Sequence, residues 1–265
     1  MNIRNINSFH LLSPSPWPIC MSLSTMCTML MIIYLMCFGF FSYMFYFNIL
    51  IFFLNLVNWF TDVHIESSLC GDHCTDVVLN LSLGYVFFIV SEIFLFISFF
   101  WSFFHMSLVS DVELGCMWPP IGLDLLDYTG IPLLNTVILL SSGFVLTWSH
   151  YNLLVNNFLS SFYALIFTII LGLYFIFIQL YEYYSSNFNI SDSVFGSLFF
   201  FITGFHGLHV IVGIIFLLVC TIRFYSSFMS IGHHKNFEYS AWYWHFVDVV
   251  WLFLYMFMYI WSFNI

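Results

Sequence analysis

The sequence predicts an all-α membrane protein with seven transmembrane helices. Of its 265 residues, 62% are hydrophobic and only 6% are charged, whereas charged residues make up about a quarter of a typical soluble domain. The apolar residues gather in seven segments, each close to or above the roughly 20 residues that cross a bilayer. The three basic residues of the chain are too few for nucleic-acid binding.

The predicted spans follow one another without a soluble domain, a linker or a repeat. Only a short turn near Gly39 separates the first two. Several spans, among them the third, sixth and seventh, are longer than about 25 residues, so we expect these three to tilt or to project beyond the hydrocarbon. The longest predicted loops, 61–78 and 108–129, carry four carboxylates each. The expected spans are 19–38, 40–60, 79–107, 130–151, 157–184, 192–224 and 236–262.

Seven spans place the two termini on opposite sides of the membrane. The N-terminus then shares one face with the loops 61–78, 152–156 and 225–235. Basic residues favour the matrix or cytoplasmic side, and all three of them fall on this face: Arg4, Arg223 and Lys235. We therefore expect the N-terminus on that side.

Glu92 lies in the middle of the third predicted span. A carboxyl group at that depth is protonated, paired, or turned toward water or lipid headgroups. Two interpretations follow for Glu92. It belongs to a proton-linked or lipid-linked site, or it is a neutral side chain that forms a hydrogen bond between helices.

Two pairs of polar residues lie inside the last two predicted spans. His206 and His209 are three residues apart, which places them on one helix face. They either bind a metal or a haem, or form structural hydrogen bonds between helices. His245 and Asp248 have the same spacing and can pair directly. That pair is either structural or part of an acid–base site, which would also need a substrate pocket.

Other cysteines and histidines lie near the predicted span ends. Cys70 and Cys74 flank Gly71-Asp72-His73, but the spacing matches no common zinc pattern, so we expect no metal in this chain. His105 and His150 are expected at the membrane interface. The loop cluster His233-His234-Lys235 either binds an anionic lipid together with Arg223, or is merely solvated.

Nine sequence blocks, in order along the chain, resemble the cytochrome c oxidase subunit III family. The resemblance runs from Phe9-His10-Leu11 to Tyr259-Ile260-Trp261. The blocks are Pro14–Pro18, Ser91-Glu92, Phe99–His105, Trp118–Pro120, Pro132–Thr136, Thr147-Trp148, Ser191–Ser197, Thr203–His209 and Ala241–Tyr255.

The resemblance implies a particular architecture and partners. Seven helices would divide into a two-helix bundle, 19–60, and a five-helix bundle, 79–262, around a V-shaped cleft filled with phospholipid, with 1–18 as an extended lead-in. Subunit III carries no redox metal, since haem and copper belong to partner subunits I and II. It packs directly on subunit I, beside subunit II and accessory subunits. It supports stability and proton uptake of a complex that oxidises cytochrome c, reduces O2 to water and pumps protons.

The resemblance also assigns residues. Glu92 matches the cleft carboxylate that reacts with carbodiimides, and the lipid site is implied at Trp59, Glu66, His73, Trp101, Arg223 and His233. Related mitochondrial chains commonly have basic residues where this chain has Ile65, Leu79 and Ser82, and a histidine in place of Asp72. We therefore do not expect lipid-headgroup binding in the form familiar from the family.

Location follows from composition and resemblance together. Phe occurs 37 times and Ala only at Ala164 and Ala241, a bias typical of a small AT-rich organellar genome, and no transit peptide is visible. We expect a multi-pass protein of the mitochondrial inner membrane, with its N-terminus in the matrix and its C-terminus in the intermembrane space. Two rival functions are a secondary transporter that uses Glu92 and Asp248, and a redox subunit with His-ligated haem.

Overall fold

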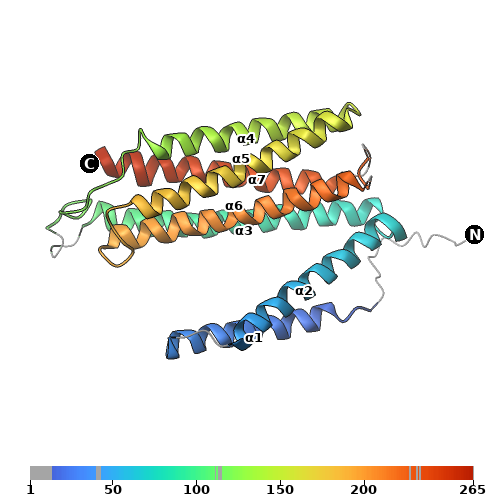
Figure 1. Ribbon diagram of the computed structural model, residues 1–265, viewed down its shortest axis with the longest axis horizontal. Coiled ribbons are helices and arrows are strands. Elements are labelled where there is room, and N and C mark those ends of the chain that lie inside the picture. The colour runs from blue at the N-terminus through green and yellow to red at the C-terminus, as the bar shows by residue number, and fades with distance from the viewer. Residues whose placement is uncertain are drawn as a thin grey trace, which may run out of the picture. The chain divides into compact units, whose positions relative to one another are not determined.

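The predicted fold class is confirmed (Figure 1). The computed structural model describes residues 14–39, 43–110, 112, 115–226, 228–230, 232 and 234–264. Within them, seven helices are long and apolar enough to cross a membrane. They are α1 (Trp17–Phe38), α2 (Tyr43–Ile65), α3 (Thr75–Leu108), α4 (Ile131–Leu154), α5 (Phe158–Ser185), α6 (Val194–Tyr225) and α7 (Lys235–Leu254).

Two of these helices continue as π-helical segments. Residues Glu66–Cys70 (η1) extend α2, and residues Tyr255–Trp261 (η3) extend α7 before the short α8 (Ser262–Asn264). The predicted loop 61–78 is therefore wrong for most of its length, because only residues 71–74 connect η1 to α3. Hydropathy indicates where the apolar residues end. A helix can extend beyond that point, because its backbone hydrogen bonds also form outside the hydrocarbon. Gly71 ends η1 in a left-handed conformation, with φ of 72°.

The chain divides into two compact units, residues 1–83 and 84–265, with the boundary inside α3. In the first unit α1 packs against α2. The Trp17 indole donates a hydrogen bond to Asp62, and the Asn48 amide donates to the carbonyl of Ser24. Polar contacts of this kind hold membrane helices together, because lipid supplies no hydrophobic driving force between them. Little of this hairpin is buried, since α2 has no buried residue.

In the second unit α4, α5, α6 and α7 form a closed ring of helices. α5 packs against α4 and α6, and α7 packs against α6 and α4, side by side in Figure 1. Aromatic side chains fill the centre, as is usual where helix faces converge on a common core. The largest fully buried side chains include Trp244, Trp251, Phe103, Phe175 and Phe199.

The part of α3 that belongs to this unit contacts α6 and α7 through aromatic rings. The Phe96 ring lies 5.0 Å from that of His209 and 6.0 Å from that of Phe246. Edge-to-face rings at such distances add about 0.5–1.5 kcal/mol per pair to the area that they bury. These large side chains set the spacing between α3 and its neighbours.

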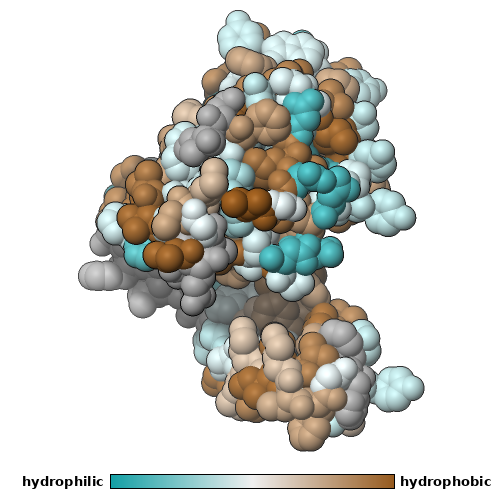
Figure 2. Space-filling model, turned by 90° about the vertical axis from the view of Figure 1, so that its left-hand side faces the viewer, coloured by the Kyte–Doolittle hydropathy of each residue, from teal (hydrophilic) through white to brown (hydrophobic). Residues whose placement is uncertain are grey.

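Figure 2 views the molecule from one end. A few hydrophilic residues lie there among hydrophobic ones. The loops that follow α3 and α5 lie at this end (Figure 1). Three carboxylates are exposed there: Asp124, Asp127 and Asp192. Thr129 donates to Asp127 from its backbone amide and its hydroxyl, and these hydrogen bonds hold the pKa of Asp127 below its usual range.

Candidate functional site

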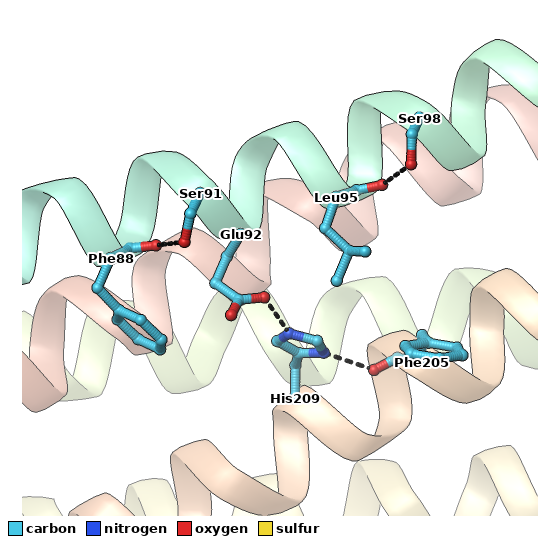
Figure 3. Close-up of polar contacts among 7 residues, drawn as sticks. All are labelled: Phe88, Ser91, Glu92, Leu95, Ser98, Phe205 and His209. Atoms are coloured by element: carbon cyan, nitrogen blue, oxygen red, sulfur yellow. Dashed lines mark hydrogen bonds and ion pairs between the residues drawn. The ribbon is translucent and has the colours of Figure 1, made fainter.

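Glu92 and His209 form the central polar contact of the second unit (Figure 3). Glu92 comes from the middle of α3 and His209 from α6, and their Oε2 and Nε2 atoms are 2.9 Å apart. The other ring nitrogen of His209, Nδ1, lies 2.7 Å from the backbone carbonyl of Phe205, one turn earlier in α6. The contact joins α3 to α6 within the apolar bundle, as the hydrogen-bonding interpretation of Glu92 requires.

These two contacts fix how many protons the pair holds. The Phe205 carbonyl can only accept a hydrogen bond, so Nδ1 of His209 carries a proton. Nε2 and Oε2 then need one further proton between them. It resides either on Glu92, giving two neutral groups, or on His209, giving an ion pair. Without that proton two acceptors would face each other at 2.9 Å. Glu92 is thus one half of a proton-holding pair, not a lone carboxyl group.

The pair is only partly enclosed. The side chains of His209 and Glu92 are 13% and 22% exposed, so a small apolar reagent can reach them. The Tyr243 ring lies nearly parallel to His209, with centroids 6.2 Å apart. Neighbouring serines of α3 make only local bonds, Ser91 to the carbonyl of Phe88 and Ser98 to that of Leu95 (Figure 3).

His206, one turn before His209, makes a different contact. Its ring is buried and its Nε2 lies 3.3 Å from the backbone carbonyl of Val247 in α7. Because a carbonyl only accepts, Nε2 is the donor. The rings of Phe175 and Trp251 pack against it. His206 thus bonds to α7, and His209 bonds to α3. Neither histidine belongs to the group of metal-ligating side chains that the described residues bring together.

The direct pairing of His245 with Asp248 that their spacing allows is not formed among the residues that the structure describes. Both side chains lie instead beside Gly143 of α4. An ideal Cβ on Gly143 would lie 2.5 Å from Oδ2 of Asp248 and 3.6 Å from Nδ1 of His245. The i, i+3 spacing did bring both groups to one face of α7, but that face packs on α4. Oδ1 of Asp248 is buried and has no hydrogen-bond partner among the described residues.

The residues expected at a lipid site are divided between the two units. Trp59 lies in α2, Glu66 in η1 and His73 in the turn before α3, all in the first unit. Trp101 of α3 is 74% exposed, and Arg223 lies in the last turn of α6, both in the second unit. His233 lies outside the described residues. Lipid binding at these positions stays a prediction.

A buried polar network of α4, α5 and η3 was not predicted from the sequence. Glu182 of α5 is 1% exposed and accepts a 2.6 Å hydrogen bond from the Tyr259 hydroxyl. One turn away, the Gln179 side chain accepts from Asn135 of α4 at 3.1 Å. Two polar residues three apart in an apolar helix were the available signal. Tyr259 gave none, since tyrosines are common in membrane spans.

Two histidines that the sequence assigned to different regions come together. His150 of α4 and His234, just before α7, lie near Glu238 in the first turn of α7. This is the one group of at least three metal-ligating side chains that the described residues bring within 4.8 Å. Cys70 and Cys74 are free thiols in the first unit.

The sequence profile of the cytochrome c oxidase subunit III family matches residues 7–263, nearly the whole chain. The chain belongs to the cytochrome c oxidase subunit III family. Cytochrome c oxidase subunit 3 of Triticum aestivum is 48% identical over 257 residues, covering 97% of both chains. That of Aedes aegypti is 46% identical over 265 residues, covering 99% of this chain and all of the relative. That of Drosophila melanogaster is 44% identical over the same length.

Membership in the cytochrome c oxidase subunit III family decides between the functions considered from the sequence. The chain is a non-redox subunit of an oxidoreductase complex, in which it sits with other subunits. The rival interpretations, a secondary transporter and a haem-bearing redox subunit, are wrong. Seven spanning helices fit the inner-membrane, multi-pass character of a subunit III protein.

Proposed function

We propose that this chain is a core subunit that stabilises cytochrome c oxidase and supports its proton uptake without taking part in electron transfer. The complex would oxidise cytochrome c, reduce O2 to water and pump protons. Haem and copper would lie in the partner subunits I and II. The chain would pack directly on subunit I, beside subunit II and accessory subunits.

The Glu92–His209 pair carries the proton-linked part of this proposal. Its hydrogen-bond pattern holds one proton that can reside on either group. Such a pair can keep a proton within the bilayer, where a bare charge would be costly. His206 and His209 both use ring nitrogens for bonds inside the chain, which fits a subunit that leaves haem ligation to its partners.

We place the chain in the mitochondrial inner membrane, with the N-terminus in the matrix and the C-terminus in the intermembrane space. The three basic residues, Arg4, Arg223 and Lys235, support this orientation because all fall on one face. A protease added to intact inner-membrane vesicles of known sidedness should cut the 109–130 connection only from the intermembrane-space side. Cutting from the matrix side would reverse the orientation.

We also propose that phospholipid binds at Trp59, Glu66, His73, Trp101, Arg223 and His233, with fewer ionic contacts than is usual in the family. Ile65, Leu79 and Ser82 offer no cation, and Asp72 would repel a phosphate. Each Lys or Arg near a membrane surface contributes about 1 kcal/mol to the binding of anionic lipid. The loss of two or three should weaken selection for anionic headgroups by roughly one to two decades. Lipid analysis of the native complex tests this, and an anionic lipid held by this chain alone would contradict it.

Removal of the subunit from the native complex tests the central proposal. The initial rate of O2 reduction should stay largely intact, because the redox centres would lie elsewhere. The number of turnovers before inactivation should fall, because lost packing would expose subunit I. Complex that passes through the same detergent steps but retains the subunit is the control. Immediate and complete loss of activity with unchanged haem spectra would contradict the proposal.

A further inference from the structure

His150, His234 and Glu238 form a cluster at the end of the bundle where α4 finishes and α7 starts. One ligand atom from each side chain lies within 4.8 Å of the others. Nε2 of His234 is 3.1 Å from Oε1 of Glu238, one turn later in the chain. The cluster is partly enclosed, since the His234 and Glu238 side chains are 11% and 17% exposed. It is separate from the Glu92–His209 pair and from the polar network of Glu182.

Two ring nitrogens of the cluster lack a partner among the residues that the structure describes. Nε2 of His150 and Nδ1 of His234 are both buried, and neither forms a hydrogen bond with those residues. A buried polar atom without a partner is destabilising, so a ligand that bonds to it is favoured. The ring of His150 is held in place by Phe237, which lies 5.4 Å away in a stacked arrangement and is itself 1% exposed. The imidazoles are thus positioned by packing and still have unused nitrogens.

We propose that His150, His234 and Glu238 bind a divalent zinc-class cation. Two imidazoles and one carboxylate are a ligand set that zinc uses with a water molecule in the fourth position. Zinc ligands lie about 2.0–2.1 Å from the metal, so tetrahedral ligand atoms are roughly 3.3 Å apart. The cluster is close to that spacing and would contract by about 1.5 Å at most on binding, through side-chain torsions. This proposal departs from our expectation from the sequence that the chain binds no metal.

Lys235 competes with the cation for Glu238. Its ammonium group lies 2.7 Å from Oε2 of Glu238, while Oε1 faces His234. Lys235 is half exposed and can turn into solvent, so binding of a cation would replace this ion pair rather than leave a buried charge. The bound ion would join the last turns of α4 to the first turn of α7, two helices that already pack against each other. It would therefore stabilise the folded chain, by an amount that grows with the logarithm of the zinc concentration divided by the Kd.

The test titrates the full chain in lipid nanodiscs with Zn2+ against a chromophoric chelator, using an affinity tag that contains no histidine. We expect one equivalent of zinc per chain. His150→Gln, His234→Gln and Glu238→Gln should each weaken zinc binding by more than about 100-fold, because loss of even an outer-sphere partner costs about 10–100-fold. Bound zinc should also raise the unfolding temperature of the unaltered chain and leave that of the three variants unchanged.

Matched controls separate this site from other donors. His105→Gln removes an exposed histidine at the end of α3, and Cys70→Ser with Cys74→Ser removes the two thiols that flank His73. Both should leave zinc binding intact. Lys235→Met keeps all three ligands and should tighten zinc binding at least about threefold, since the competing ion pair is lost. If a ligand variant fails to fold, the zinc affinity of Lys235→Met still tests the proposal. Four outcomes would each overturn the proposal. They are the absence of stoichiometric zinc, zinc binding that survives the three ligand variants, loss of zinc binding in the cysteine variant, and unchanged zinc affinity in Lys235→Met.

Discussion

At Gly143, a hydrogen atom stands where a side chain would collide with Asp248. The carboxylate Oδ2 would be 2.5 Å from a Cβ at this position, which is far inside van der Waals contact. The glycine therefore permits α4 and α7 to pack with a carboxyl group between them. Gly204 of α6 differs, because a Cβ there would meet nothing within 4 Å.

We expect Gly143→Ala to lower the free energy of unfolding by about 1–3 kcal/mol, the usual cost of overpacking. Gly204→Ala is the matched control and should be neutral or stabilising by up to about 1 kcal/mol, because alanine is the better helix former. Unfolding of the chain in mixed detergent micelles measures both. Equal effects of the two substitutions would show that α4 and α7 yield easily around Asp248.

Glu92 should react with a hydrophobic carbodiimide in preference to loop carboxylates. The reagent needs a protonated carboxyl group, and the neutral form of the Glu92–His209 pair avoids two charges inside the bilayer. Asp127 is the comparison, since its lowered pKa keeps it ionised at neutral pH. Mass spectrometry of the treated native complex should find the adduct at Glu92 and lose it in Glu92→Gln. Adducts confined to loops would show that the proton of the pair resides on His209.

Trp244 joins four helices at the scale of secondary-structure elements. Its indole Nε1 donates to the Ser142 hydroxyl of α4 at 2.9 Å. Its ring lies against Gly172 of α5 and Gly213 of α6, where a Cβ would come within 2.6 and 2.9 Å of ring atoms. One side chain from α7 thus fills the space that small residues on three other helices leave open, which is how membrane helices reach close packing.

Ser142→Ala should destabilise the bundle by about 1–3 kcal/mol, because it leaves the buried indole N–H of Trp244 without an acceptor. The neighbouring serine provides the control. The Ser141 hydroxyl bonds only to the carbonyl of Ile138 in its own helix, so Ser141→Ala should change stability by less than about 0.5 kcal/mol. The unfolding temperatures of both variants in detergent test this prediction. Equal changes in the two unfolding temperatures would show that the hydrogen bond from the Trp244 indole does not contribute to stability.

The two units of the whole molecule differ in how much they bury. In the most apolar windows of α4 to α7, between 33% and 50% of residues are buried, whereas the figures for α1 and α2 are 6% and 0%. A hairpin that buries so little of itself must be stabilised by lipid or by other subunits. The helices of the ring are stabilised mainly by one another.

Hydrogen exchange should reflect this difference. In detergent and without partner subunits, backbone amides of α1 and α2 should exchange faster than those of α4 to α7, because exchange protection follows the number of buried contacts. Mass spectrometry of the exchanged chain resolves the segments. In the native complex the gap should narrow. Equal protection of both units in detergent would show that the hairpin is stable by itself.

The fold class, the seven spans and the family could all be predicted from the sequence. Hydrophobic runs of bilayer length leave no alternative for the backbone, which must satisfy its hydrogen bonds within each segment. It also marked Glu92, His206, His209, His245 and Asp248 as polar residues at membrane depth. The sequence-based prediction overestimated the length of the loop 61–78, because hydropathy indicates the end of the apolar residues and not the end of the helix.

Which polar groups meet could not be predicted without the packing of the helices. Helical spacing places His245 beside Asp248, yet both lie against Gly143, and nothing in the sequence links Glu92 to His209, which are 117 residues apart. The same holds for Glu182 with Tyr259 and for His150 with His234 and Glu238. Such pairs depend on the order and rotation of helices in the ring. Packing of large aromatic side chains against small residues sets that order, and periodicity within a single helix does not contain it.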